Sequence, residues 1–153
     1  MAWHNFVSPQ AVFDRLKVGD QDRLSQLLQV PAGIDPLTDA GLQQAVDYAN
    51  AEIESFVLAR YSQPFAVIPP ILAGYGVSLA IWRLKQRRRE LISDEDRTDF
   101  EDTMRALREI SDGTRQLIFP PENQTEALVP PTRVAVSSVT EGQREFRRNL
   151  ESF

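Results

Sequence analysis

Five basic side chains crowd one short stretch of this chain, at Arg83, Lys85, Arg87, Arg88 and Arg89. Guanidinium and ammonium groups bind phosphate oxygens and carboxylates, so this cluster is a candidate contact for DNA or for the acidic face of a neighbouring subunit. The cluster also stands at the C-terminal end of an expected helix, where the helix dipole stabilises cations. That structural explanation is the simpler one, and the sequence does not decide between the two.

The remaining residues that could support chemistry are sparse or are explained by local structure. Six carboxylates crowd residues 94–102, but these are the first turns of an expected helix, where negative charge is favoured. The single histidine, His4, has no cysteine and no second histidine with which to form a zinc site or a nucleophilic pair. A glycine-rich phosphate loop and a nucleophile elbow are also missing from the sequence. We therefore expect no enzyme, no metal site and no cofactor.

Composition sets further limits on the class of protein. A chain of 153 residues is of single-domain size, and its net charge of -5 argues against a dedicated nucleic-acid-binding protein. The chain contains no cysteine, which is compatible with the cytosol or a virion. No apolar run approaches the roughly 20 residues of a membrane span, so we expect no membrane contact.

The spacing of apolar residues predicts an all-α protein, a bundle of about four principal helices. Ser8 and Pro9 are a typical helix start, and the first helix should end near Gly19. Thr38 or Asp39 should cap a second, long helix that runs to Arg60 and Tyr61. Its buried stripe is expected to be Leu42, Val46, Ala49, Ile53, Phe56 and Val57, and its solvated face Gln43, Asp47, Asn50 and Glu54.

Two further helices are expected before residue 118. Pro70 is suited to the first position of a helix that is apolar around most of its circumference, and this helix should therefore be central. Ser93 and Asp96 match a capping box, which predicts the start of a helix that Gly113 ends. The apolar stripe of this last helix is expected to be Phe100, Met104, Leu107 and Ile110.

The order of these elements resembles a known family. The run of residues 42–61, ending in Arg60-Tyr61, is followed by Pro64, by Pro69-Pro70-Ile71-Leu72 and by a helix over residues 75–88. This pattern is similar to the small virion assembly proteins of Mu-like phages and prophages, which resemble head-tail connectors, or head-completion adaptors. The resemblance covers roughly residues 6–117 and rests on order and spacing rather than on one distinctive motif.

The resemblance implies a structural role at the neck of the virion, with the protein in the host cytoplasm before assembly. It implies a homo-oligomeric ring of roughly twelve copies below the portal, joining the DNA-filled head to the tail. The implied partners are the portal protein, a tail terminator or tail-completion protein, and genomic DNA in the lumen. The basic cluster would then face DNA or the next subunit. Tyr61 would lie between subunits, and Arg60 would either cap its own helix or pair across the subunit boundary.

The sequence divides into a helical core, residues 1–117, and a C-terminal arm, residues 118–153. Proline pairs interrupt the arm, yet it retains a potential edge strand and a short amphipathic helix with Phe146, Leu150 and Phe153 at helical spacing. We expect the arm to extend from the core, with a reach on the order of 100 Å, and to become ordered only on assembly. Its expected docking residues are Val134, Val136, Val139, Phe146, Arg147, Leu150 and Phe153.

A second function remains open, that of a small helical DNA-binding or regulatory protein that uses Arg87-Arg88-Arg89. It predicts affinity for free duplex DNA that falls as salt rises. A connector predicts little binding of DNA by the monomer.

Overall fold

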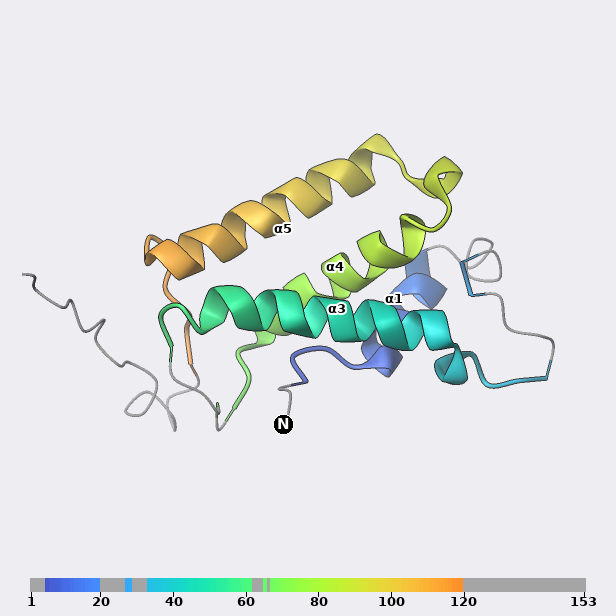
Figure 1. The fold of residues 1–153 in the computed structure, drawn as a ribbon, viewed down its shortest axis with the longest axis horizontal. Helices are drawn as coiled ribbons and strands as arrows, with labels where there is room; N and C mark the ends of the chain where they lie inside the picture. The colour runs from blue at the N-terminus through green and yellow to red at the C-terminus, as the bar shows by residue number, and fades with distance from the viewer. Residues whose placement is uncertain (1–4, 20–26, 29–32, 62–64, 66, 120–153) are drawn as a thin grey trace, which may run out of the picture.

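A computed structural model of the full chain describes residues 5–19, 27–28, 33–61, 65 and 67–119. These residues form four α-helices and two short 3-10 turns, and they contain no β-strand (Figure 1). The all-α prediction is therefore confirmed for this part of the chain. The helices are α1 (Pro9–Gly19), α3 (Ala40–Val57), α4 (Pro70–Lys85) and α5 (Asp94–Asp112), and the 3-10 turns are η1 (Pro36–Thr38) and η2 (Arg89–Leu91).

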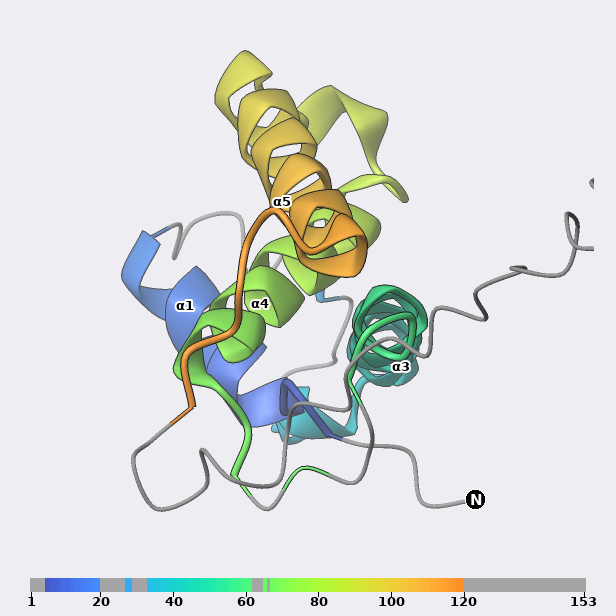
Figure 2. The ribbon, with the colours of Figure 1, turned by 90° about the vertical axis from the view of Figure 1, so that its left-hand side faces the viewer.

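Helix α4 lies at the centre of the bundle, as its apolar circumference predicts. Figure 2 shows α1 and α3 on opposite sides of α4, with α5 lying across the top. The N-terminal segment and α3 can approach α4 closely because residue 76 is glycine: a Cβ there would stand 2.8 Å from the Val7 Cβ and 3.2 Å from the Ile53 Cδ1. None of the helices among the described residues has both the length and the apolarity needed to cross a membrane.

The helix ends follow the local signals of the sequence. Of the two candidate caps for α3, Asp39 is the one used, and its carboxylate accepts from the Leu42 backbone N–H at 2.8 Å. Ser93 and Asp96 form the predicted capping box of α5, which ends at Gly113 in the left-handed conformation with φ 85°. Helix α3 ends at Val57, short of Tyr61, and the Arg60 and Tyr61 backbone N–H groups both donate to the Val57 carbonyl, at 3.1 and 2.9 Å, in the turn that follows.

The long helix buries its predicted stripe, with one correction on the opposite face. Leu42, Ala49, Ile53 and Val57 are almost fully buried, whereas Phe56 is only partly buried. Asn50, expected in solvent, is 5 % exposed.

The amide of Asn50 is buried because the N-terminal segment crosses α3 there. Its Oδ1 accepts from the Val7 N–H at 3.0 Å, and its Nδ2 donates to the Val7 carbonyl at 3.2 Å. One side chain thus satisfies both polar groups of a buried peptide segment, which an apolar residue cannot do.

The chain that follows α5 packs against the helical body near the predicted boundary at residue 117. The Leu117 backbone N–H donates to the Tyr61 hydroxyl at 3.0 Å. The Phe119 ring lies 5.8 Å from that of Tyr61 and 5.4 Å from that of Phe65, and Phe119 is buried. The chain therefore returns from α5 onto its own core at least as far as Phe119. The docking residues expected between Val134 and Phe153, and His4, lie outside the described residues.

Candidate functional site

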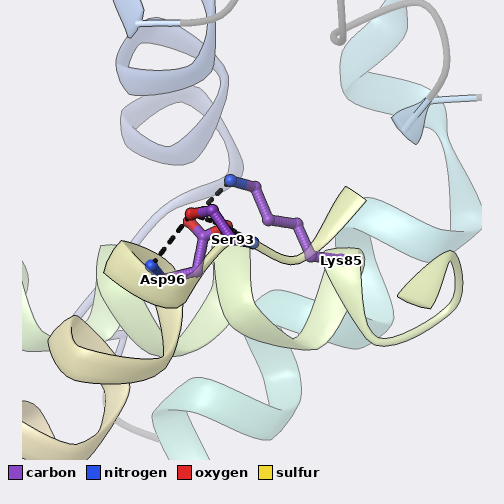
Figure 3. A network of polar contacts seen from close by, with 3 residues as sticks. All are labelled: Lys85, Ser93 and Asp96. Carbon is purple, nitrogen blue, oxygen red and sulfur yellow. Dashed lines mark hydrogen bonds and ion pairs between the residues drawn. The ribbon is translucent and has the colours of Figure 1, made fainter. Parts of the chain in front are cut away.

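The predicted basic cluster does not act as one unit, because Lys85 is part of the core. Its ammonium lies 2.6 Å from Asp96 Oδ1, and the two side chains are only 8 % and 18 % exposed (Figure 3). The pair fixes the end of α4 against the start of α5. The ammonium of Lys85 is therefore satisfied inside the described body, and its contact with DNA or another subunit stays a prediction.

Asp96 is held ionised by this arrangement. Burial alone raises the pKa of Asp96, but hydrogen bonds from Lys85 and Ser93, together with the charge of Lys85, outweigh it and leave the pKa below its ordinary value. The Ser93 backbone N–H and hydroxyl both donate to Asp96 Oδ2 at 2.8 Å. The same carboxylate therefore caps α5 and neutralises the buried lysine.

Of the other predicted basic residues, Arg83, Arg87 and Arg89 border a groove of about 800 Å³ between α3, the end of α4 and the start of α5. Arg88, at the turn before η2, is not among its lining residues. We call this feature the arginine groove; the residues that define it are Tyr48, Trp82, Arg83, Arg87, Arg89 and Arg97.

Contacts from α3 position two of the guanidinium groups. Arg83 lies over the Tyr48 ring at 4.7 Å from its centroid. Arg87 donates to Gln44 Oε1 at 3.0 Å, and its guanidinium occupies the space that a Cβ on Gly41 would fill. These arginines are therefore held in place above α3 by glycine, amide and aromatic neighbours.

The groove arginines form no ion pair within the described residues, although the Asp39 carboxylate lies near Arg87 beside Gly41. Across the described ranges, the ion pairs are Lys85–Asp96, Arg105–Asp102 and Arg115–Glu109, so none of the four groove arginines is paired with a carboxylate there. Such a concentration of guanidinium groups suits carboxylate or phosphate oxygens.

The aromatic side chains of the groove are already engaged. Trp82 stacks on Phe100 with centroids 4.7 Å apart and ring planes inclined by 14°, and Arg83 covers the Tyr48 ring. The Trp82 Nε1 is buried and has no hydrogen-bond partner among the described residues. These rings form the wall of the groove and are poor platforms for stacking free bases.

A row of carboxylates lies on the other side of α5. Glu95, Asp99 and Asp102 follow one another at i, i+4 and i+7, and they border the hollows between α5 and the α1-facing side of α4. Arg97 is turned by about 200° from Glu95 around the helix. The arginine groove and this carboxylate stripe, defined as Glu95, Asp99 and Asp102, therefore lie on opposite sides of α5.

The two residues expected between subunits have different surroundings. Tyr61 is 2 % exposed and its hydroxyl accepts from the Leu117 backbone N–H, so its side chain belongs to its own core, and its contact with another subunit stays a prediction. The Arg60 guanidinium occupies the space beside Gly113 that a Cβ would fill, at the end of α5. Its Nε is buried and has no hydrogen-bond partner in the described part of the chain.

Sequence reasoning missed Arg97 as a site residue. Arg97 is the one basic residue within the acidic run of residues 94–102, and that signal was available. Gln44 and Tyr48 gave no such signal, because they reach the groove only through the packing of α3 on α4.

Comparison with known proteins defines the family. The family model described as "Bacteriophage Mu, Gp36" matches residues 12–136. The chain belongs to the bacteriophage Mu Gp36 family. This Gp36-family protein is also 28 % identical, over 102 residues, to the Mu-like prophage FluMu protein gp36 of Haemophilus influenzae, an alignment that covers 67 % of this chain and 70 % of the relative.

The family match confirms the resemblance to Mu-like phage proteins and extends it. The matched span runs to residue 136, well beyond the limit of 117 expected from the sequence pattern. The first part of the predicted arm therefore belongs to the Gp36 family pattern.

Proposed function

We propose that this Gp36-family protein is a structural assembly protein of the virion, a head-tail connector that forms a ring below the portal and joins the DNA-filled head to the tail. Membership in a phage Mu family supports a role in the phage particle. The proposal of a ring is supported by one observation: the arginine groove and the carboxylate stripe lie on opposite sides of α5.

Opposite faces of opposite charge are suited to repeated head-to-tail contact. In such a contact one surface of each copy meets a different surface of the next, and a suitable rotation between copies closes a ring. Charge complementarity guides the copies into register and disfavours contact between like faces. In this proposal the portal and a tail terminator or tail-completion protein are the partners above and below, and no catalytic activity is involved.

The segment of residues 120–153 is proposed to dock onto those partners. Its apolar positions from Val134 to Phe153 match a strand or short helix that a partner surface completes. Arg60, beside the end of α5, remains a candidate for pairing with the next subunit.

The proposal is tested in the phage or prophage that encodes the protein. Deletion of the gene should yield DNA-filled heads that lack tails, and full-length protein supplied in trans should restore tailed, infectious particles. Protein lacking residues 120–153 should keep the far-UV circular dichroism of a helical protein but fail to enter particles. Normal tailed particles without the protein would overturn the connector role, and full incorporation of the truncated form would overturn the role of the arm.

A DNA-binding function is the second candidate, because four arginines face one groove without a carboxylate partner in the described residues. It predicts that the isolated protein binds duplex DNA with an affinity that falls steeply with salt. The net charge of -5 opposes this function. Fluorescence anisotropy with a labelled duplex between 50 and 200 mM salt, roughly the range over which phosphate contacts weaken, separates the two candidates.

A further inference from the structure

We infer that the arginine groove is the receiving half of the joint between copies of this chain, and that the carboxylate stripe of a second copy occupies it. The inference rests on the proposed ring and assigns the two surfaces that make the contact. It names one occupant for the groove: the side of α5 that carries Glu95, Asp99 and Asp102.

The groove provides guanidinium groups that are held in place before any partner arrives. Arg83 is braced by Tyr48, and Arg87 is braced by Gln44 on the open backbone at Gly41. Fixed donors lose less conformational freedom on binding than free surface arginines. A carboxylate that enters the groove would accept charge-assisted hydrogen bonds there.

The stripe provides the matching acceptors. Glu95 and Asp102 are seven residues apart on one helix face, a length of about 10 Å. Asp102 pairs with Arg105, but both side chains are more than half exposed at 60 % and 67 %, and a pair in solvent is easily exchanged for a better one. Glu95 and Asp99 form no ion pair with the residues that the structure describes.

The positions of the two surfaces require a second molecule. In Figure 2, α5 stands above α4 with α3 on one side and α1 on the other. The groove opens on the α3 side and the stripe faces the α1 side, so the stripe of one molecule cannot reach its own groove. Each copy can therefore receive one neighbour and be received by another, which is the geometry of a heterologous contact.

A helix face fits the groove better than nucleic acid does. The groove is a hollow between helices and includes apolar side chains such as Ala45 and Ile92 beside the arginines. Its aromatic rings are covered by Phe100 and Arg83 and offer little surface to bases. The net charge of -5 repels a polyanion, whereas a local acidic face can still approach.

Charge exchange tests the joint directly. The groove variant carries Arg87→Glu and Arg97→Glu, and the stripe variant carries Glu95→Arg and Asp99→Arg. Each full-length variant alone should self-associate at least about tenfold more weakly than the native protein in sedimentation velocity at low salt, because like charges then meet. An equal mixture should recover association, since each altered face meets a complementary altered face. Failure of the mixture to recover would overturn the inference.

Two controls separate loss of the contact from loss of the fold. Both variants must retain the helical signal and the melting temperature of the native protein within a few degrees. Tyr48→Leu is a milder probe, because it removes the ring over which Arg83 lies and keeps an apolar side chain at that half-buried position. It should weaken association with little change in the melting temperature, and native-like association of this variant would overturn a role for Arg83 in the contact.

Disulfide trapping locates the contact independently, because the chain has no cysteine. Full-length protein with Gln44→Cys in the groove and Asp102→Cys on the stripe should form a ladder of linked copies under mild oxidation. The matched control pairs Gln44→Cys with Val18→Cys, since Val18 is 85 % exposed on α1. The absence of a ladder, or an equal ladder in the control, would overturn the inference.

The outcomes distinguish the joint from the proposed function. A protein that enters virions normally but gives no specific ladder keeps its connector role and loses this joint. Loss of binding to labelled duplex or single-stranded DNA in the groove variant, with native self-association, would assign the groove to nucleic acid and overturn the inference.

Discussion

Asn50 allows a direct test of how the N-terminal segment is held to the helical body. Its side-chain amide makes two hydrogen bonds to Val7, one as acceptor at 3.0 Å and one as donor at 3.2 Å. Asn50 is 5 % exposed and Val7 is 3 % exposed, so water has little access to either group. We predict that Asn50→Ala destabilises the protein far more than a surface amide substitution.

The magnitude follows from the groups that lose their partners. A buried donor or acceptor without a partner costs about 1 to 3 kcal/mol, and Asn50→Ala leaves one of each at Val7. Water that enters the vacated space compensates part of this, so we expect a loss of about 2 to 4 kcal/mol in the free energy of unfolding. For a protein of this size the melting temperature should fall by roughly 5 to 15 °C.

The assay is urea and thermal unfolding followed by far-UV circular dichroism, with Gln43→Ala as the matched control. Gln43, also on α3, donates from its amide to the Leu37 carbonyl at 2.9 Å, but this bond is exposed and water replaces it. The control should therefore lose less than about 0.5 kcal/mol. Equal losses for the two variants would refute the argument from burial.

The substitution Asn50→Asp adds a pH signature. The introduced carboxylate would face the Val7 carbonyl in a buried site, so its pKa in the folded state should lie above its unfolded value of about 3.9. A raised folded pKa means that stability is greatest below the unfolded value and falls as pH rises through the folded value. The variant should therefore regain stability, relative to Asn50→Ala, as pH falls towards 4; a pH-independent difference would contradict this explanation.

Three further substitutions test other contacts. Asp96→Asn should lower the free energy of unfolding by about 2 kcal/mol at pH 7, because Lys85 is left buried without its counter-charge. The pKa of Asp96 is lowered in the folded state, so the stability that its charge contributes is present above the unfolded pKa of about 3.9 and is lost as pH falls through the folded value. Urea titrations should therefore show a smaller difference in stability between Asp96→Asn and the native protein at pH 3 than at pH 7. Gly113→Ala should lower the free energy of unfolding by about 1 to 2 kcal/mol, since φ is 85° there and the new methyl group also displaces Arg60. An unchanged melting temperature would contradict the left-handed cap. Ile53→Asp should abolish the cooperative unfolding transition, because a charge at a fully buried position has no partner, and a native melting curve would show that α3 packs through another face.

The ends of the helices were predictable because they depend on neighbouring residues. The capping box at Ser93 and the glycine at residue 113 act within a few positions of themselves, and the structure uses both as expected; of the two candidate caps of α3, it uses Asp39. The end of α3 was placed too late because an Arg-Tyr pair has no strong preference against a helix, whereas in the structure the Arg60 and Tyr61 backbone N–H groups both donate to the Val57 carbonyl in a turn.

The charged site was only partly predictable. The basic cluster was visible in the sequence, but the sequence did not show that its members have different surroundings. Lys85 pairs with Asp96 inside the body, whereas Arg87 lies over Gly41 on a helix more than forty positions away. The same limit applies to Tyr61, which is buried by Leu117 and Phe119 after a long excursion of the chain. Arg97 joins the groove because α5 is set across the end of α4.

The sequence by itself determined which segments are helical, most of their ends and most of the apolar residues that face the core, since these depend on periodicity and on local backbone preferences. Only the tertiary structure decided which polar groups are satisfied inside the body and which remain available to another molecule. Asn50 and Lys85 bind partners on other elements, while the arginine groove is formed by three helices and its arginines form no ion pair within the described residues. Pairing of charges depends on distances of a few ångströms between elements, and those distances are fixed only when the helices pack.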